Sequence, residues 1–200
     1  MRKTLVCIFL AGCSDPVPPG DAMSFRDDFD SLASAWEVSE RGVSAEDGKL
    51  VMRAGVGAAP EAKYTLPSPY GPGWDFRVSS AVAIGNPCAS MEISTGHARR
   101  HTWALNLEPD SARGHWDLQV GDGDGWETIG VGGDVPDPAI ARLRVDGGDV
   151  GLWLNDEQVV DTVIEQAAPN AVSIQLGVTR CRIVGSVGQF DWVEIEELER

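Results

Sequence analysis

The feature of this sequence that most limits its fold is a period of two in its apolar residues. Apolar side chains alternate with small or polar ones, as in a β-strand with one buried face, most clearly over residues 76–84, 90–94 and 172–178. No convincing amphipathic helix of three turns follows residue 20. Turn-forming Gly, Pro, Asn and Asp residues separate the alternating stretches. The pattern predicts an all-β, antiparallel two-sheet sandwich of roughly a dozen strands.

Two hairpins can be registered from the same alternation. In the first, pairing Leu107 with Gly114 collects the apolar residues, Trp103 and Trp116 among them, on one face. The opposite face then carries Arg100, Thr102, Asn106, His115, Asp117 and Gln119. In the second, pairing Val145 with Val150 places Arg142 opposite an outward-facing Trp153, where a cation–π contact is expected.

The acidic composition excludes one class of partner. The chain has 31 Asp and Glu residues against 16 Lys and Arg residues, and its formal net charge is −15. A nucleic-acid-binding protein gains most of its affinity by neutralising phosphates with Lys and Arg. We therefore expect no nucleic-acid partner.

The N-terminal segment is typical of an export signal. Arg2 and Lys3 precede the short apolar run of residues 5–10, which is followed by Ala11-Gly12-Cys13. Leu10-Ala11-Gly12-Cys13 resembles the lipobox of bacterial lipoproteins, in which the Cys thiol receives a diacylglyceryl group and the chain is cut before it. The resemblance implies a signal peptide over residues 1–12 and a membrane anchor of the palmitate type on Cys13. An ordinary secretory signal, or a buried strand with an incidental Cys, is the alternative.

This organisation divides the chain into a tether and one domain. Residues 13–23 are rich in Pro and Gly, show no periodic apolar pattern and are interpreted as a flexible tether, and residues 24–200 form the sandwich. The expected location is the cell envelope, with the bilayer as a partner through acylated Cys13. Ser14 follows the modified residue, and by resemblance to lipoproteins of diderm bacteria this favours the outer membrane.

Two cysteines remain for the exported domain. Cys7 leaves with the signal and Cys13 carries the lipid, so Cys88 and Cys181 are left in a compartment where disulfides persist. An even number of remaining cysteines favours a disulfide bond between them. The alternative is two reduced thiols, each buried separately.

Several motifs in the body of the chain resemble one large fold family. They are Phe25-Arg26-Asp27-Asp28-Phe29-Asp30 with Trp36, Asp47-Gly48-Lys49-Leu50-Val51-Met52, the hairpin of residues 142–156, and the closing stretch of residues 188–195. Together they look like the concanavalin A-like jelly rolls of the lectin, glucanase and laminin-G-like group. The resemblance implies two curved sheets, one of them concave, in a domain that binds glycans, cleaves them or holds proteins together. It also suggests a calcium site that joins Asp27 or Asp28 to Asp191.

Catalysis is not expected from the sequence. Glucanases of this group carry a Glu-x-Asp-x-x-Glu motif on a concave strand. The segment Glu194 to Glu199 copies the spacing, but it has Glu in place of Asp and ends at the chain terminus, where it is interpreted as a solvated acidic end. We predict that the chain is not an enzyme and has no resident cofactor, apart from the suggested calcium ion.

Glycan or surface-ligand binding is the predicted function. Sugars are held by exposed aromatic rings together with amides, carboxylates and Arg side chains. The weak ligand-binding candidates are Arg77, Glu92, Arg100, Asn106, His115, Asp117, Gln119 and Trp153. Two alternatives remain, a structural or protein-interaction module without a small ligand and a degenerate glycoside hydrolase-like domain.

Overall fold

The structure is a computed structural model of the 200-residue chain. It describes residues 23–39, 41–55, 59–71, 73–84, 87–94, 102–108, 114–121, 125–165, 170–180 and 186–198. These ranges form fifteen strands and contain no helix. No segment within them is a helix of the length and apolar character needed to cross a membrane. The predicted all-β class is confirmed.

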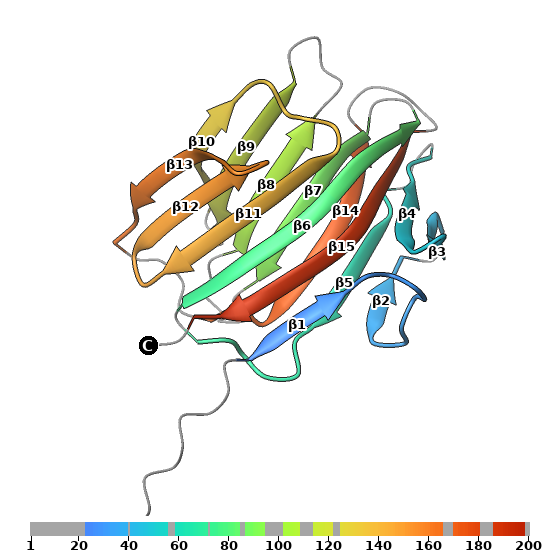
Figure 1. The fold of residues 1–200 in the computed structure, drawn as a ribbon, viewed down its shortest axis with the longest axis horizontal. Helices are drawn as coiled ribbons and strands as arrows, with labels where there is room; N and C mark the ends of the chain where they lie inside the picture. Colours follow the sequence, from blue (N-terminus) through green and yellow to red (C-terminus); the bar gives the residue numbers. More distant parts are fainter. Residues whose placement is uncertain are drawn as a thin grey trace, which may run out of the picture.

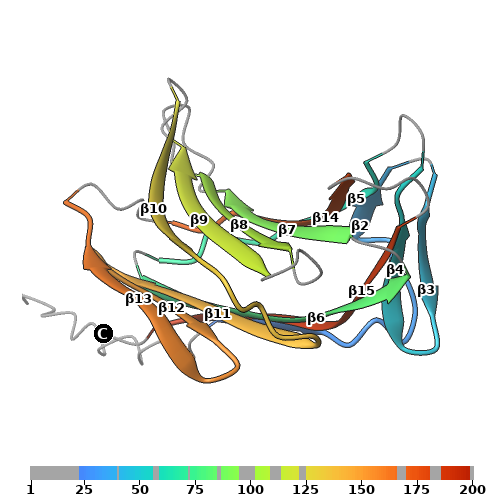
Figure 2. The same ribbon diagram turned by 90° about the horizontal axis from the view of Figure 1, so that it is seen from above.

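The strands form two antiparallel sheets that lie face to face (Figures 1 and 2). The first has the order β13-β12-β11-β6-β15-β4-β3, with β1 paired to β15. Its members are β13 (Glu157–Val163), β12 (Asp149–Leu154), β11 (Ala139–Asp146), β6 (Gly73–Ile84), β15 (Val187–Glu197), β4 (Lys49–Arg53), β3 (Val43–Glu46) and β1 (Ser24–Asp27).

The second sheet has the order β10-β9-β8-β7-β14-β5-β2. Its members are β10 (Trp126–Gly132), β9 (His115–Gly121), β8 (Thr102–Glu108), β7 (Pro87–Ser94), β14 (Ser173–Arg180), β5 (Glu61–Thr65) and β2 (Trp36–Val38). Its edges bend away from the first sheet, so its outer face is concave (Figure 2). We call it the concave sheet and the other the convex sheet.

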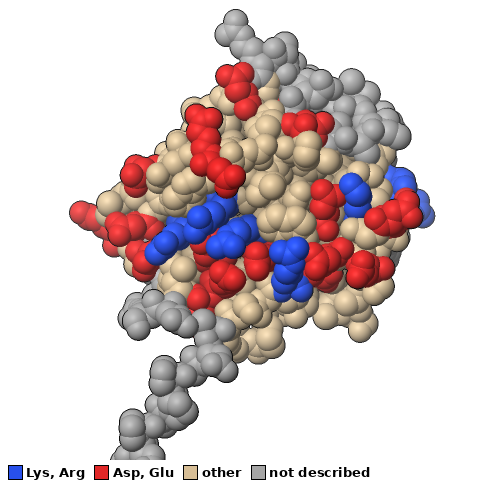
Figure 3. All heavy atoms as spheres, in the orientation of Figure 1, with Lys and Arg blue, Asp and Glu red and all other residues tan. Residues whose placement is uncertain are grey.

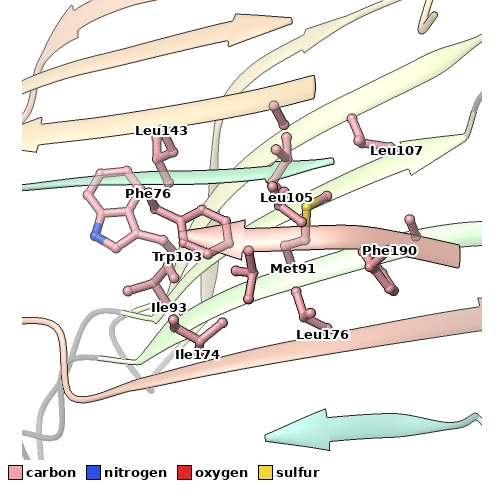
Figure 4. Close-up of a cluster of buried hydrophobic side chains, with 14 of the residues drawn as sticks. Phe76, Met91, Ile93, Trp103, Leu105, Leu107, Leu143, Ile174, Leu176 and Phe190 are labelled. Carbon is pink, nitrogen blue, oxygen red and sulfur yellow. The ribbon is translucent and has the colours of Figure 1, made fainter. Parts of the chain in front are cut away.

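One apolar layer fills the space between the sheets. Alternate residues of both sheets point into it, and Trp74, Trp103, Phe76 and Phe190 are among its largest fully or almost fully buried side chains. Figure 4 shows side chains of the two sheets meeting there. The indoles of Trp74 and Trp103 pack edge to face, with ring centroids 6.4 Å apart. Since the strands alternate, burying one set of residues fixes which residues form the two outer faces.

The hairpin of β11 and β12 confirms its predicted register, and the hairpin of β8 and β9 corrects the other. Val145 pairs with Val150, and Arg142 pairs with Trp153. Leu107 pairs with Trp116 and not with Gly114. The shift is two residues, and because the side-chain period is also two, the predicted inner and outer faces remain correct.

Two tight turns have the backbone geometry that their residues favour. The two-residue turns Asp47-Gly48 and Asn155-Asp156 have positive φ at both positions, from 45° to 70°. This is the type I′ geometry whose twist matches that of paired strands, and Gly, Asn and Asp adopt it most readily.

An aromatic cluster joins the N-terminal strand to the concave sheet. The Phe25 ring stacks on Tyr64 with centroids 4.0 Å apart, and Trp36 packs against both rings. The Asp27 carboxylate accepts hydrogen bonds from the Trp36 indole N–H at 2.8 Å and from the Phe29 backbone N–H at 2.7 Å. Asp27 therefore serves to hold the N-terminal turn.

Truncation in the shared apolar layer should cost far more than truncation at a sheet edge. Leu118 on β9 is fully buried, whereas Val131 on β10 is 60% exposed. Leu118→Ala should lower the free energy of unfolding by about 2–5 kcal/mol because it leaves a cavity. Val131→Ala, the control, should change it by no more than about 0.5 kcal/mol. Urea unfolding monitored by tryptophan fluorescence measures both, and similar losses would contradict the assigned inner and outer faces.

Candidate functional site

The outer face of the concave sheet carries a continuous polar floor. Strand register places Glu92 of β7 between Ala104 of β8 and Gln175 of β14, while Gln119 of β9 lies opposite Ala104. The next row consists of Asp117, Asn106, Ser90 and Gly177. With strands about 4.8 Å apart, the floor from β9 to β5 is about 19 Å wide. It is therefore wide enough for an extended ligand.

A small hydrogen-bonded network fixes one part of this floor. The side-chain amides of Asn106 and Gln119 both donate to Asp117 Oδ1, at 3.0 and 2.6 Å. His115 Nε2 lies 3.9 Å from Asp117 Oδ2. The Asp117 side chain is only 16% exposed. Because these groups hold one another in place, they present oriented donors and acceptors to a ligand.

Glu92 is a partly desolvated acid of the floor. Partial burial raises the pKa of its carboxyl group, and the negative charge of Glu61 raises it further. A partly desolvated carboxyl group on a concave face is suited to hydrogen bonding with sugar hydroxyls or to proton transfer.

Trp126 is a candidate that the sequence analysis did not include among the ligand-binding residues. It begins β10, pairs with Gly121 and is 54% exposed. A Cβ atom built on Gly121 would lie 3.1–3.3 Å from three adjacent carbons of the Trp126 ring, so the indole rests on the glycine backbone. Gly121 occupies an outward position of β9, in line with Gln119 and Asp117. The ring therefore supplies an exposed aromatic surface at the rim of the floor.

The structure brings together five of the eight predicted ligand-binding residues. Glu92, Asn106, His115, Asp117 and Gln119 lie on the outer face of the concave sheet. Arg77 and Trp153 do not share this face, because they lie on β6 and β12 of the convex sheet. Their strands alternate in the predicted way, but alternation does not tell which of two sheets a strand joins.

Other predicted positions fall outside the described residues. These are Arg100, the lipidation site Cys13, and Cys181 together with the side chain of Cys88. The proposed disulfide therefore stays a prediction.

The suggested calcium ligands are engaged separately. Asp27 holds Trp36 and Phe29, as described above. Asp28 pairs with Arg26 at 2.6 Å, and Lys49 Nζ lies 2.8 Å from Asp191 Oδ1. Among the described residues, no three His, Cys, Asp or Glu side chains converge as a metal site. The calcium hypothesis is not supported by the positions of these carboxylates.

The acidic segment after Glu194 was misplaced by the sequence analysis. It belongs to β15, which lies between β6 and β4 in the convex sheet. Glu194 is 18% exposed, and its carboxylate lies 3.7 Å from the guanidinium groups of both Arg26 and Arg77. Glu194 is therefore an ion-paired residue of a central strand, on the side of the molecule away from the concave face.

Three solved structures that match this chain share one fold. No protein-family model matches the sequence, and no curated protein matches it. A lichenase from a mouse hindgut metagenome is 12% identical with a TM-score of 0.73, covering 88% of this chain and all of that one. The Bacillus licheniformis β-glucanase is 10% identical with a TM-score of 0.71, covering 88% and 98%. A non-specific endo-β-1,3(4)-glucanase from family GH16, SCLam, is 11% identical with a TM-score of 0.64, covering 90% and 93%. This chain has the fold of these glucanases.

These similarities confirm the jelly-roll sandwich and correct one prediction. The sequence analysis expected no enzyme, because it found no hydrolase motif on a concave strand. That expectation is contradicted, since several of the structures that share this fold over almost their full length are endo-glucanases.

Neutralising Glu92 should stabilise the domain at neutral pH. Because the folded-state pKa lies above the unfolded value, folding favours the protonated carboxyl group, and stability is lost as the pH rises through the folded pKa. Glu92→Gln should therefore melt at a higher temperature than the parent at pH 7. The difference should shrink at pH 4, where the parent residue is largely protonated.

Thermal unfolding by circular dichroism at the two pH values measures this effect. Glu127→Gln, at an exposed position of β10, is the matched control. A Glu92→Gln variant with the same melting temperature as the parent at pH 7 would show that the carboxyl group is well solvated.

Proposed function

We propose that this chain is a glycoside hydrolase-like domain that binds a glycan along its concave face. The observation that carries the proposal is the exposed Trp126 ring beside the Asn106, Asp117 and Gln119 network. Sugar recognition combines an apolar ring surface for the pyranose face with oriented amides and carboxylates for the hydroxyl groups. Both parts lie on outward positions of the neighbouring strands β8, β9 and β10.

The negative charge of the floor limits which class of glycan can bind. Its described acids include Glu61, Glu92 and Asp117, against the single cation Lys63 on the outer positions of β5. Such a surface repels carboxylated or sulfated polymers at ordinary ionic strength. The glucanase fold of the similar structures also supports a neutral glucan as the first ligand to test.

Loss of the Trp126 ring should weaken glycan binding without unfolding the domain. Trp126→Ala should reduce affinity for β-glucan oligosaccharides about tenfold, equivalent to about 1.4 kcal/mol. Trp126→Phe should retain part of the affinity because a flat ring remains. Isothermal titration with laminarin and lichenan oligosaccharides measures the change.

A variant outside the concave face serves as the control. Val163→Ala on β13 removes exposed apolar surface of the convex sheet and should leave affinity unchanged. If the parent binds none of a panel of neutral glycans, or if Trp126→Ala binds as well as the parent, the proposed site is wrong.

Hydrolysis of the bound glycan is the second candidate function, and Glu92 favours it. Its raised pKa suits a general acid that protonates the glycosidic oxygen. Glu61, whose charge acts on Glu92, is then the second carboxylate, which activates water or attacks the anomeric carbon. Reducing-end release from laminarin or lichenan should fall at least about 100-fold in Glu92→Gln while binding persists. Release that is undiminished in this variant excludes Glu92 as the acid.

The lipid anchor predicted from the sequence completes the proposal. Supporting it, the described domain begins on the convex sheet, where the Glu197 backbone N–H donates to the Met23 carbonyl. A tether that joins the domain there leaves the concave face directed away from its attachment point. In a diderm bacterial host, the parent should partition into the detergent phase of Triton X-114, and Cys13→Ser should partition into the aqueous phase. Aqueous partitioning of the parent would contradict lipidation.

A further inference from the structure

A row of charged and aromatic side chains crosses the outer face of the convex sheet. Strand register places its members directly opposite one another on six neighbouring strands. In order from β13 to β1 they are Gln158, Trp153, Arg142, Arg77, Glu194 and Arg26. Figure 3 shows the basic side chains gathered across this face and surrounded by acidic ones. In a chain with a net charge of −15, a cluster of basic side chains on one face calls for a structural or functional explanation.

Two arginines of the row share one buried carboxylate. Arg77 and Arg142 lie opposite each other on β6 and β11, an arrangement of like charges that is unfavourable by itself. Asp75, whose side chain is 2% exposed, accepts from Arg142 Nε at 2.9 Å and Nη2 at 2.5 Å. It also accepts from Arg77 Nε at 3.2 Å and Nη2 at 3.4 Å. One carboxylate thus holds two cations, and the Glu194 and Glu196 carboxylates, 3.7 and 3.6 Å from Arg77, add further negative charge beside that arginine.

This arrangement leaves part of each guanidinium available. Asp75 occupies the Nε and Nη2 edge of both arginines, whereas a guanidinium carries five N–H donors. The two side chains remain 32% and 36% exposed. The Arg142 guanidinium carbon lies over the Trp153 ring, 5.0 Å from the ring centroid. This cation–π contact holds the guanidinium group in place from a second direction. Preorganised, partly free guanidinium forks are well suited to binding carboxylates and phosphates.

A hollow of about 420 Å³ lies directly over these groups. It is lined by Arg77, Ile140, Arg142, Trp153 and Asp156. Its volume falls within the range of ligand pockets, roughly 300–1,000 Å³. Ile140 is 44% exposed and adds apolar surface next to the Trp153 ring, while Asp156 adds an acceptor. The Trp153 ring rests on Gly151, where a Cβ atom would lie 2.3 Å from its Cη2 atom, so the glycine makes room for the ring.

We propose that this hollow binds a single acidic sugar unit, a hexuronate. Its carboxylate is held by the free N–H groups of Arg77 and Arg142, its apolar ring face contacts Trp153 and Ile140, and its hydroxyl groups donate to Asp156. The surrounding acids, among them Asp146, Asp149 and Asp161, exclude a long polyanion or a flat anionic surface. The site is separate from the concave face, because its residues belong to the other sheet.

The test is a titration of the full domain with sodium glucuronate, glucose and inorganic phosphate. Glucuronate should bind, glucose should not, and phosphate should bind more weakly because it lacks a ring. Glucuronate affinity should fall about 10- to 100-fold in Arg142→Lys, which keeps the charge but loses the fork. Arg144→Lys, whose parent residue pairs with Asp146, is the matched control and should bind normally.

A second variant keeps the test independent of folding. Ile140→Glu replaces an exposed side chain and puts a carboxylate into the hollow, so it should abolish glucuronate binding without lowering the melting temperature. Trp126→Ala, on the opposite face, should leave this binding intact. Phosphate binding as strong as glucuronate binding would overturn the sugar assignment. Glucuronate affinity unchanged in Arg142→Lys and Ile140→Glu, or no binding at all, would overturn the site.

Discussion

The apolar layer between the two sheets is the constraint on which the rest of the structure depends. Each strand alternates, so once its apolar residues enter that layer its other residues must face outward. The concave floor and the convex charged row both result from this alternation of buried and outward-facing residues. Glu92 is outward because Met91 and Ile93 are buried, and Arg77 is outward because Phe76 and Val78 are buried. Function in this fold is therefore a question of what the two outer faces carry.

Much of this could be predicted from the sequence, and the failures have a common cause. Alternation gave the strand faces, and Asp-Gly and Asn-Asp pairs gave the turns. The Leu107 register missed by two residues because pairing Leu107 with Gly114 or with Trp116 leaves the apolar faces equally matched, and only the loop geometry separates the two. Arg77 and Trp153 were grouped with Asn106 because a local pattern contains no information about sheet membership. The acidic residues from Glu194 onward were interpreted as a solvated end because the position of β15 inside its sheet is set by pairing across more than 100 residues, as between β6 and β15.

Two glycines determine the positions of the outward-facing indoles of Trp126 and Trp153. Trp126 rests on Gly121 and Trp153 rests on Gly151, each in a cross-strand or same-face position that a side chain would fill. A ring that lies on bare backbone loses rotational freedom without losing its outer surface, and this lowers the entropic cost of binding a ligand. The acidic, Gly-rich stretch between Gly121 and Trp126 is typical of a turn, but the sequence does not tell that the Trp126 ring lies on Gly121.

The two outer faces differ in how their charges are used. On the concave face, acids stand beside amides, and desolvation of Glu92 raises its pKa, so this face retains an electrostatic cost that a ligand can relieve. On the convex face, the buried Asp75 would be costly alone, and pairing with Arg77 and Arg142 compensates its charge. The faces share the apolar layer but no strand, and their polar groups have no common partner in the described part of the chain. Substitutions on the two faces should therefore combine additively in their effects on stability, as expected for distant sites without shared contacts.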